Sequence, residues 1–432
     1  MFTDCSLGTQ PSVNHEVLRL AAVSNRRRCV GVQPAPILFE RATNDLKGYP
    51  VIRNIKRTAA IAGVVAVSSV SLVACNSSDD TDTAATETAA ESSAAETQAE
   101  GSETAVAGDY VLSGETGALV AEGASSQQKA MDYFGEIYAK EVPGANLAYN
   151  PSGSGAGQKN FIANQVKFAG SDSPLKDEQV EEAAARCGGN EAWHLPFVIG
   201  PVAIAYNIDG VDELNLTIDN IVDIFQGTIT NWNDPALAES NPDATLPDLP
   251  IQVFFRSDES GTSDNFQKFL AAASDGKWTG EGKAFPQEVG TGANGSTGVA
   301  QEVNATNGAI TYVEAGFADN KANIDFGHGP VELNKDTVGN ALANMEFKTE
   351  GHNMVVDADK LFASDAADSY PLILTTYEIV CSAGYDEATS NQIKDFLNLA
   401  LDHQDDELEA EGFIPVTGAH AERLREAVNA IQ

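Results

Sequence analysis

From Tyr110 to the end of the chain, short apolar runs alternate with segments in which apolar residues recur at helical spacing. The runs "FVIGPVAIAYNI", "IQVFF", "GAITYVE" and "YPLILTTYEIVC" are typical of strands. By contrast, Ile221, Ile224 and Phe225 share one face of a predicted helix. Such alternation indicates sheets that are covered by helices. The fold class predicted for this body is therefore α/β.

Within the body, a strand-like run, a loop of small residues and a helix-like segment follow one another in three places, at residues 122–138, 149–166 and 253–270. The loops are rich in serine and glycine. Each following helix has a predicted apolar face, and for the first two helices this face consists of Met131, Phe134 and Tyr138, and of Phe161, Ile162 and Val166. Three such loops in one chain favour a shared chemical role.

That chemistry is anion binding. The first N–H groups of a helix have no partner inside the helix, and the helix dipole is positive at this end. Glycine lets the backbone approach a ligand closely, and serine or threonine adds a hydroxyl donor. The third loop, "SDESGTS", also has Arg256 directly before it. Any one of these loops taken alone is more often an ordinary helix start.

Two acids narrow the choice of anion. Asp172 lies in "GSDSPL" and Asp258 lies in the third loop. A carboxylate next to an anion is unfavourable unless that anion carries a proton to donate, and phosphate at neutral pH carries one whereas sulfate does not. We therefore predict that both acids exclude sulfate. Asp172 alone could equally be a helix cap.

Other readings of the loops are weaker. "SDESGTS" could be an ordinary turn or hold a serine nucleophile, but no G-x-S-x-G elbow is present and no histidine close in sequence suggests a base. The histidines are scattered singly and no cysteine spacing is typical of a metal site. The sequence predicts no enzyme, no cofactor and no metal.

The N-terminal quarter of the chain has a different character. Residues 51–74 combine a basic start with an apolar run too short to span a membrane comfortably, which is typical of a signal peptide. The run ends in "LVAC", which resembles a lipoprotein signal, so Cys75 is the expected lipidation site. Residues 1–50 would then be a mis-annotated extension. Residues 75–108 are acidic and lack aromatic side chains, which predicts a disordered tether.

Charge and cysteines add two expectations. With 26 Lys and Arg against 63 Asp and Glu, the formal net charge is −37, which excludes nucleic acid and anionic membrane surfaces as partners. If Cys75 is lipidated, Cys187 and Cys381 are the cysteines left in the exported body. An oxidising exterior permits a disulfide between them.

The body resembles the phosphate-binding protein of the bacterial phosphate ABC importer. The resemblance is strongest in "SGSGAG", "GSDSPL", "FRSDESGTSDNF", "GTITNWNDPAL" and "NGAITYVE". It implies a two-lobe, flytrap fold that closes on one phosphate, with lobe one at residues 109–199 and 373–432 and lobe two at 200–372. It also implies a lipid-anchored monomer on the outer face of the cell membrane, which delivers inorganic phosphate to permease subunits. The alternatives are a binding protein for sulfate or molybdate and a secreted phosphohydrolase.

The same resemblance implies the residues of the pocket. The family has Thr-Phe where this chain has Ser125 and Ser126, so these two contacts depart from the usual pattern. The remaining positions match the family motifs. The expected phosphate-binding residues are Ser125, Ser126, Ser154, Asp172, Arg256, Asp258, Ser260, Gly261 and Thr262.

Overall fold

The computed structural model describes residues 110–432 except 344 and 364–365. The predicted signal peptide, the predicted lipidation site Cys75 and the predicted tether lie outside the described residues. The chain divides into the units 1–95 and 96–432, and every described residue belongs to the second. No helix within the described residues has the length and apolar character needed to cross a bilayer.

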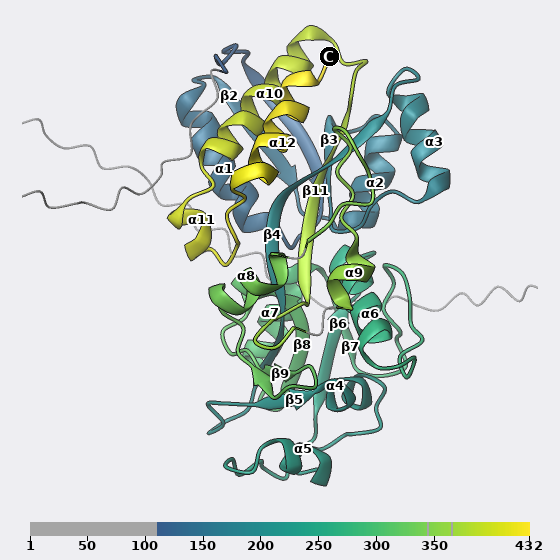
Figure 1. The fold of residues 1–432 in the computed structure, drawn as a ribbon, viewed down its shortest axis with the longest axis vertical. Coiled ribbons are helices and arrows are strands. Elements are labelled where there is room, and N and C mark those ends of the chain that lie inside the picture. The colour runs from purple at the N-terminus through teal and green to yellow at the C-terminus, as the bar shows by residue number, and fades with distance from the viewer. Residues whose placement is uncertain (1–109, 344, 364–365) are drawn as a thin grey trace, which may run out of the picture. The chain divides into compact units, whose positions relative to one another are not determined.

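The first lobe is a sheet with helices on both faces (Figure 1). Parallel strands β1, β2 and β3 stand next to β11, which is antiparallel to β3. Neighbouring residues of β11 face opposite sides: Val380 packs in the core with α1 and α10, and Ile379 packs in the core with α2 and α3. The elements are β1 (Gly117–Gly123), α1 (Gln128–Glu141), β2 (Ala145–Asn150), α2 (Ser154–Ile162), β3 (Phe168–Ser171), α3 (Asp177–Arg186), β11 (Ile373–Cys381), α10 (Glu387–Asp402), α11 (Asp406–Ala410) and α12 (Gly418–Ala430).

The second lobe repeats the α/β plan in a smaller sheet. Strand β6 is parallel to both β7 and β8. Strands β5, β9 and β10 form a separate three-stranded sheet. The elements are β5 (Asn215–Thr217), α4 (Ile218–Phe225), α5 (Pro235–Ser240), β6 (Gln252–Arg256), α6 (Gly261–Ala273), β7 (Thr291–Ala293), α7 (Gly295–Ala305), β8 (Ala309–Glu314), the 3-10 helix η1 (Ala315–Phe317), β9 (Asn323–Asp325), β10 (Pro330–Val331), α8 (Lys335–Leu342) and α9 (Ala358–Phe362).

One long strand joins the lobes. Strand β4 (Ala192–Asn207) pairs with β11 as far as Pro201, and with β8 from Val202 onward. The result is a single eight-stranded sheet in the order β2-β1-β3-β11-β4-β8-β6-β7. The near-continuous apolar run of β4 follows from this position, because almost all of its residues are buried. Strand β4 thus changes its partner close to residues 199 and 200, where the boundary between the lobes is expected from the sequence.

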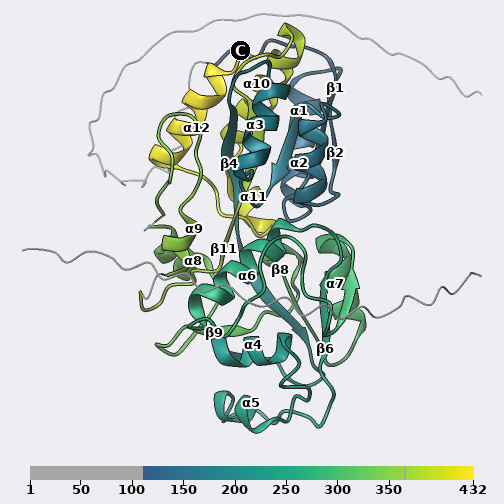
Figure 2. The same cartoon turned by 90° about the vertical axis from the view of Figure 1, so that its right-hand side faces the viewer.

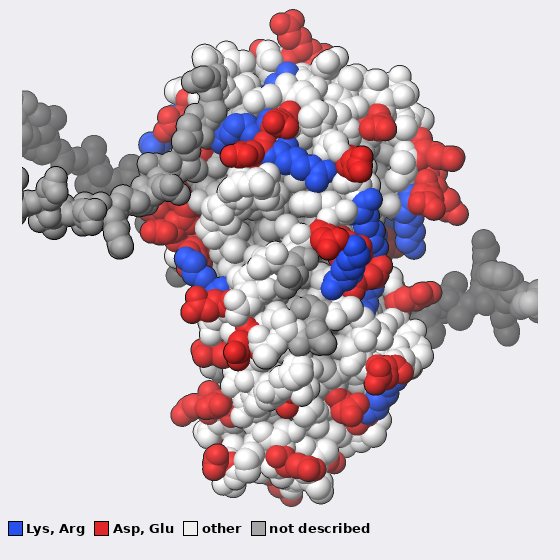
Figure 3. All heavy atoms as spheres, in the orientation of Figure 1, with Lys and Arg blue, Asp and Glu red and all other residues white. Residues whose placement is uncertain are grey.

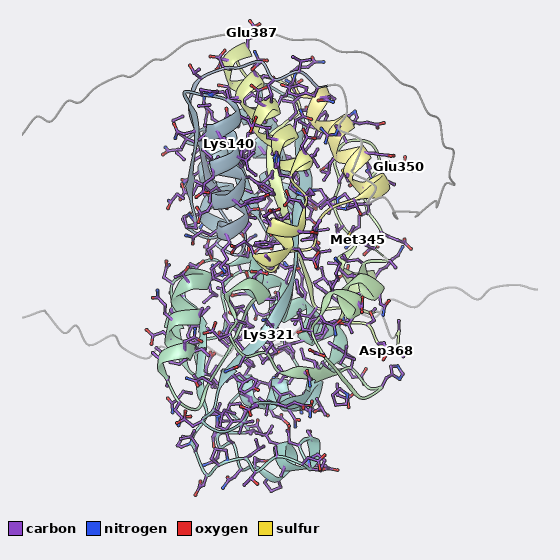
Figure 4. The ribbon with its side chains drawn as sticks, turned by 90° about the vertical axis from the view of Figure 1, so that its left-hand side faces the viewer. Lys140, Lys321, Met345, Glu350, Asp368 and Glu387 are labelled. Atoms are coloured by element: carbon purple, nitrogen blue, oxygen red, sulfur yellow. A yellow bond between two sulfur atoms is a disulfide. The ribbon has the colours of Figure 1, made fainter. Side chains whose placement is uncertain are left out.

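The segment around residues 347–356 departs from the expected division, which placed it in lobe two. Its backbone bonds to lobe one: Met354 N–H donates to His194 O at 2.9 Å, and Val356 N–H donates to the Tyr377 hydroxyl at 3.2 Å. Arg423 of α12 donates from Nε to Gly351 O at 2.8 Å. Figure 4 shows Glu350 of this segment beside α12. These bonds join residues that are far apart in sequence. A lobe boundary predicted from strand patterns cannot take such bonds into account.

The predicted helix faces are largely confirmed. Met131, Phe134 and Tyr138 are buried along α1. Helix α2 is shorter than expected, however, and ends at Ile162, so the buried Val166 lies outside it. The reason is Asn164, whose φ of 55° is left-handed and cannot continue a right-handed helix.

A disulfide joins Cys187, directly after α3, to Cys381 at the end of β11. Their Cα atoms are 5.4 Å apart, within the usual range for a disulfide. Both residues are fully buried in the core around α2 and α3. The bridge therefore links two segments of the same lobe that are 194 residues apart in sequence.

Candidate functional site

The candidate site lies where the carboxyl ends of parallel strands from both lobes meet. In lobe one, β1 leads into α1, β2 leads into α2, and β3 ends just before Asp172. In lobe two, β6 leads into α6 and β7 leads into α7, and Figure 2 shows both helices at the end of this lobe that faces lobe one. Because the strands are parallel within each lobe, their following loops gather at one edge of the sheet. Each loop thus presents a helix N-terminus to the same region.

Asp172 is the centre of a hydroxyl network from both lobes. The hydroxyls of Ser126 and Thr376 donate to its Oδ1 at 2.6 and 2.8 Å, and Thr262 donates to Oδ2 at 3.1 Å. The residue is 3% exposed. Burial raises the pKa of Asp172, while the hydrogen bonds from Ser126 and Thr376 oppose that rise. Asp172 is therefore a buried acceptor that hydroxyls from both lobes surround.

Arg256 carries the positive charge of the site. It is 2% exposed and forms a two-point ion pair with Asp258, in which Nε donates to Oδ1 at 2.8 Å and Nη2 donates to Oδ2 at 2.5 Å. Gly295 N–H also donates to Asp258 Oδ1, at 3.0 Å. Burial alone would raise the pKa of Asp258, but the hydrogen bonds and charge of Arg256 lower it. Both oxygens of Asp258 are therefore already engaged in orienting Arg256.

Two glycines allow the lobes to approach. A Cβ on Gly261 would lie 2.5 Å from Ser154 Oγ and 2.6 Å from Asp172 Cβ, so any side chain there would push the lobes apart. Gly153 has a φ of 100° and no room beside Asp258, which accounts for glycine at that position. The lobes are therefore closed in this structure, with their backbones in contact at the site.

Three further predicted residues, all serines near the starts of helices, accept hydrogen bonds from backbone N–H groups. Ser154 begins α2, and its Oγ accepts from Asp172 N–H at 3.1 Å. Ser260 caps α6, and its Oγ accepts from Ser263 N–H at 3.2 Å. Ser125 accepts at Oγ from Ser296 N–H at 2.9 Å, across the lobes. The residues predicted to bind phosphate therefore lie close together, and hydrogen bonds or direct contacts link them.

The structure adds two residues that the sequence reasoning missed. Ser296, at the start of α7, bonds to Ser125 and accepts from Arg256 Nη1 at 3.3 Å. Its segment "TGANGSTG" has the same small-residue pattern before a helix as the three loops, so the sequence contained a signal for it. Thr376 had no such signal, since it lies in the middle of the apolar strand β11.

Figure 3 shows acidic and basic side chains interspersed over one face of the body, while the whole chain has a formal net charge of −37. Lys159 forms an exposed ion pair with Glu259 across the lobes. Long-range attraction from such a surface does not favour an anion, so local donors have to supply the binding energy. Among the described residues, no group of three His, Cys, Asp or Glu side chains is arranged to hold a metal ion.

Comparisons with known proteins identify the family of this chain. Residues 78–403 match the model of the PBP superfamily domain. Phosphate-binding protein PstS3 of Mycobacterium bovis (strain BCG / Pasteur 1173P2) is 39% identical over 384 residues, which cover 87% of this chain and 99% of the relative. Phosphate-binding protein PstS 2 of Mycobacterium tuberculosis (strain ATCC 25618 / H37Rv) is 42% identical over 322 residues, or 72% of this chain and 87% of the relative.

Solved structures share the fold. A periplasmic phosphate-binding protein, PfluDING, bound with phosphate at pH 8.5, aligns with a TM-score of 0.58 and 22% identity, covering 72% of this chain and 93% of that one. A phosphate-binding protein from Stenotrophomonas maltophilia aligns with a TM-score of 0.54 and 22% identity, over 72% and 94% of the two chains. Together with the sequence matches, these findings place the chain in the PBP superfamily and, within it, in the PstS family of phosphate-binding proteins.

Proposed function

We propose that this protein captures inorganic phosphate outside the cytoplasmic membrane and delivers it to the permease of an ABC importer. The observation that supports this most is the combination of a buried guanidinium, Arg256, with the buried hydroxyls around Asp172. The names of its relatives, phosphate-binding proteins of the PstS type, support the same function.

The site offers phosphate three kinds of partner. Arg256 supplies positive charge, and the N-termini of α1, α2 and α6 supply N–H groups. Ser126, Ser154 and Thr262 supply hydroxyls that can turn from their present partners to the ligand. Asp172 accepts the phosphate proton. Since the donors come from both lobes, a bound phosphate favours the closed arrangement over an open one.

The test is a calorimetric titration of the protein with phosphate, sulfate and arsenate at pH 7. We expect tight binding of one phosphate per chain and a preference over sulfate of about tenfold or more, because sulfate has no proton for Asp172. Equal affinities for phosphate and sulfate would contradict the role of Asp172. Steady turnover of a phosphate ester by the purified protein would instead support the alternative, a phosphohydrolase.

We also propose that the protein acts as a monomer anchored by a lipid on Cys75. The basic start, the apolar run and "LVAC" support this anchor. A tether of acidic, polar residues would keep the body near the permease and raise its local concentration there. In fractionated cells, Cys75→Ala is expected to move the protein from the membrane fraction to the soluble one. Retention of the variant in the membrane fraction would count against lipidation.

A further inference from the structure

Strand β11 contains a buried acid that the site described above does not use. Glu378 is 0% exposed, and neither of its carboxylate oxygens has a hydrogen-bond partner among the described residues. It lies two positions after Thr376, whose hydroxyl donates to Asp172. A buried carboxylate without partners is strongly disfavoured, whereas the neutral acid is tolerated far better. Glu378 is therefore a buried acid near the site whose protonated form is favoured by its surroundings.

The neighbour of Glu378 is the side-chain amide of Gln127, at the start of α1. Gly170 on β3 is the cross-strand partner of Glu378, and a Cβ on Gly170 would lie 2.2 Å from Gln127 Nε2. The amide thus fills the space opposite Glu378. Gln127 Nε2 donates to the Tyr149 hydroxyl at 3.1 Å, and that hydroxyl donates to Ala124 O at 2.7 Å. This chain of bonds reaches the backbone directly before Ser125 and Ser126.

The polar group beside Glu378 is the side-chain amide of Gln127. Gln127 Oε1 is buried without a donor, and a protonated carboxyl has the O–H that this acceptor lacks. The partner of Glu378 on β4 is Leu195, which does not titrate. No Lys, Arg or His among the described residues forms an ion pair or hydrogen bond with Glu378. The titratable groups that act on its carboxyl are Asp172 and Tyr149.

Of these two groups, Asp172 disfavours a charged Glu378, and Tyr149 supplies no charge that would offset this. Burial raises the pKa of Glu378 to about 8, and the negative charge of Asp172 adds to this, while the amide of Gln127 opposes it. Burial also raises the pKa of Tyr149, and Glu378 contributes to that shift, so the tyrosine stays neutral. Near neutral pH the acid is therefore largely protonated, and it is poised to lose its proton in mild base.

We propose that Glu378 is a positioning residue that couples a proton to phosphate capture. The proposal rests on the proposed function. Phosphate bound at Asp172 adds negative charge near Glu378 and so favours its protonated form, which takes a proton from solvent. By reciprocity, ionised Glu378 weakens phosphate binding. Ionised Glu378 also attracts the amide N–H of Gln127 away from the Tyr149 hydroxyl, which loosens the loop that carries Ser125 and Ser126.

The test is the number of protons taken up when phosphate binds. Titrations of the full chain at pH 8.5, in two buffers of different ionisation enthalpy, measure this number under conditions where free phosphate is already mainly a dianion. We expect about half a proton or more per phosphate for the wild type and almost none for Glu378→Gln. Between pH 7 and 9, the affinity of the wild type should fall about tenfold further than that of the variant.

Controls separate this role from others. Asp395→Asn changes another buried acid, on α10, whose oxygens accept from Tyr110 and Ser113 rather than contacting the loop before α1. This variant should keep the uptake of the wild type. If Glu378→Gln does not fold, Glu378→Met provides the same comparison with a side chain of similar volume. Phosphate binding without proton uptake, or with equal uptake in Glu378→Gln, would overturn the coupling alone. A complete lack of phosphate binding would overturn both proposals.

Discussion

Arg256→Met is expected to lower the affinity for phosphate by about a hundredfold or more, because it removes charged hydrogen bonds that are each worth about 1.5–3 kcal/mol. It should also lower the free energy of unfolding by about 3–5 kcal/mol, because Asp258 is left buried without its cation. Calorimetric titration measures the first effect, and denaturant unfolding measures the second.

A second variant separates the two effects. In the double variant Arg256→Met/Asp258→Asn the unpaired charge is gone, so much of the stability should return while phosphate binding stays lost. Lys159→Met is the matched control, since it breaks an ion pair across the lobes whose side chains are 64% and 50% exposed. Exposed pairs contribute about 0–1 kcal/mol, so this control should unfold almost like the wild type. Binding by Arg256→Met within threefold of the wild type would refute the role of the guanidinium.

Asp172→Asn is expected to weaken phosphate binding by about tenfold to a hundredfold and to improve sulfate binding relative to phosphate. The amide has an N–H where the carboxylate accepts hydrogen bonds from Ser126, Thr376 and Thr262. It can donate to a sulfate oxygen, whereas the carboxylate only repels it. Paired titrations with both anions at pH 7 give the selectivity directly. An unchanged ratio of the two affinities would show that selectivity lies elsewhere.

Asp258→Asn is the informative comparison for that experiment. The sequence alone assigned sulfate rejection to both acids, but both oxygens of Asp258 accept from Arg256 in the structure. We therefore expect Asp258→Asn to weaken binding of both anions by a similar factor, since it loosens Arg256. A specific gain for sulfate in this variant would restore the role that the sequence suggested.

Several features of this protein followed from the sequence because their causes are local. Strands and helices were recognisable from the spacing of apolar residues, as for Met131, Phe134 and Tyr138 on α1. The loops predicted to bind an anion stood out because glycine, serine and a helix start are adjacent in the chain. The pairing of Cys187 with Cys381 could be predicted by elimination. None of these inferences requires knowledge of which distant segments meet.

Only the tertiary structure decided the features that depend on distant segments. Thr376 and Asp172 are 204 residues apart, and a strand pattern does not reveal that one hydroxyl points at the other's carboxylate. The packing of residues 347–356 on lobe one and the burial of Glu378 against Gln127 are of the same kind. The same holds for Asp258, which is only two residues from Arg256. The sequence suggested that Asp258 contacts the anion, whereas in the structure it forms a buried ion pair with Arg256. Local spacing determines which groups are available, whereas desolvation and long-range pairing determine which of them remain free to bind a ligand.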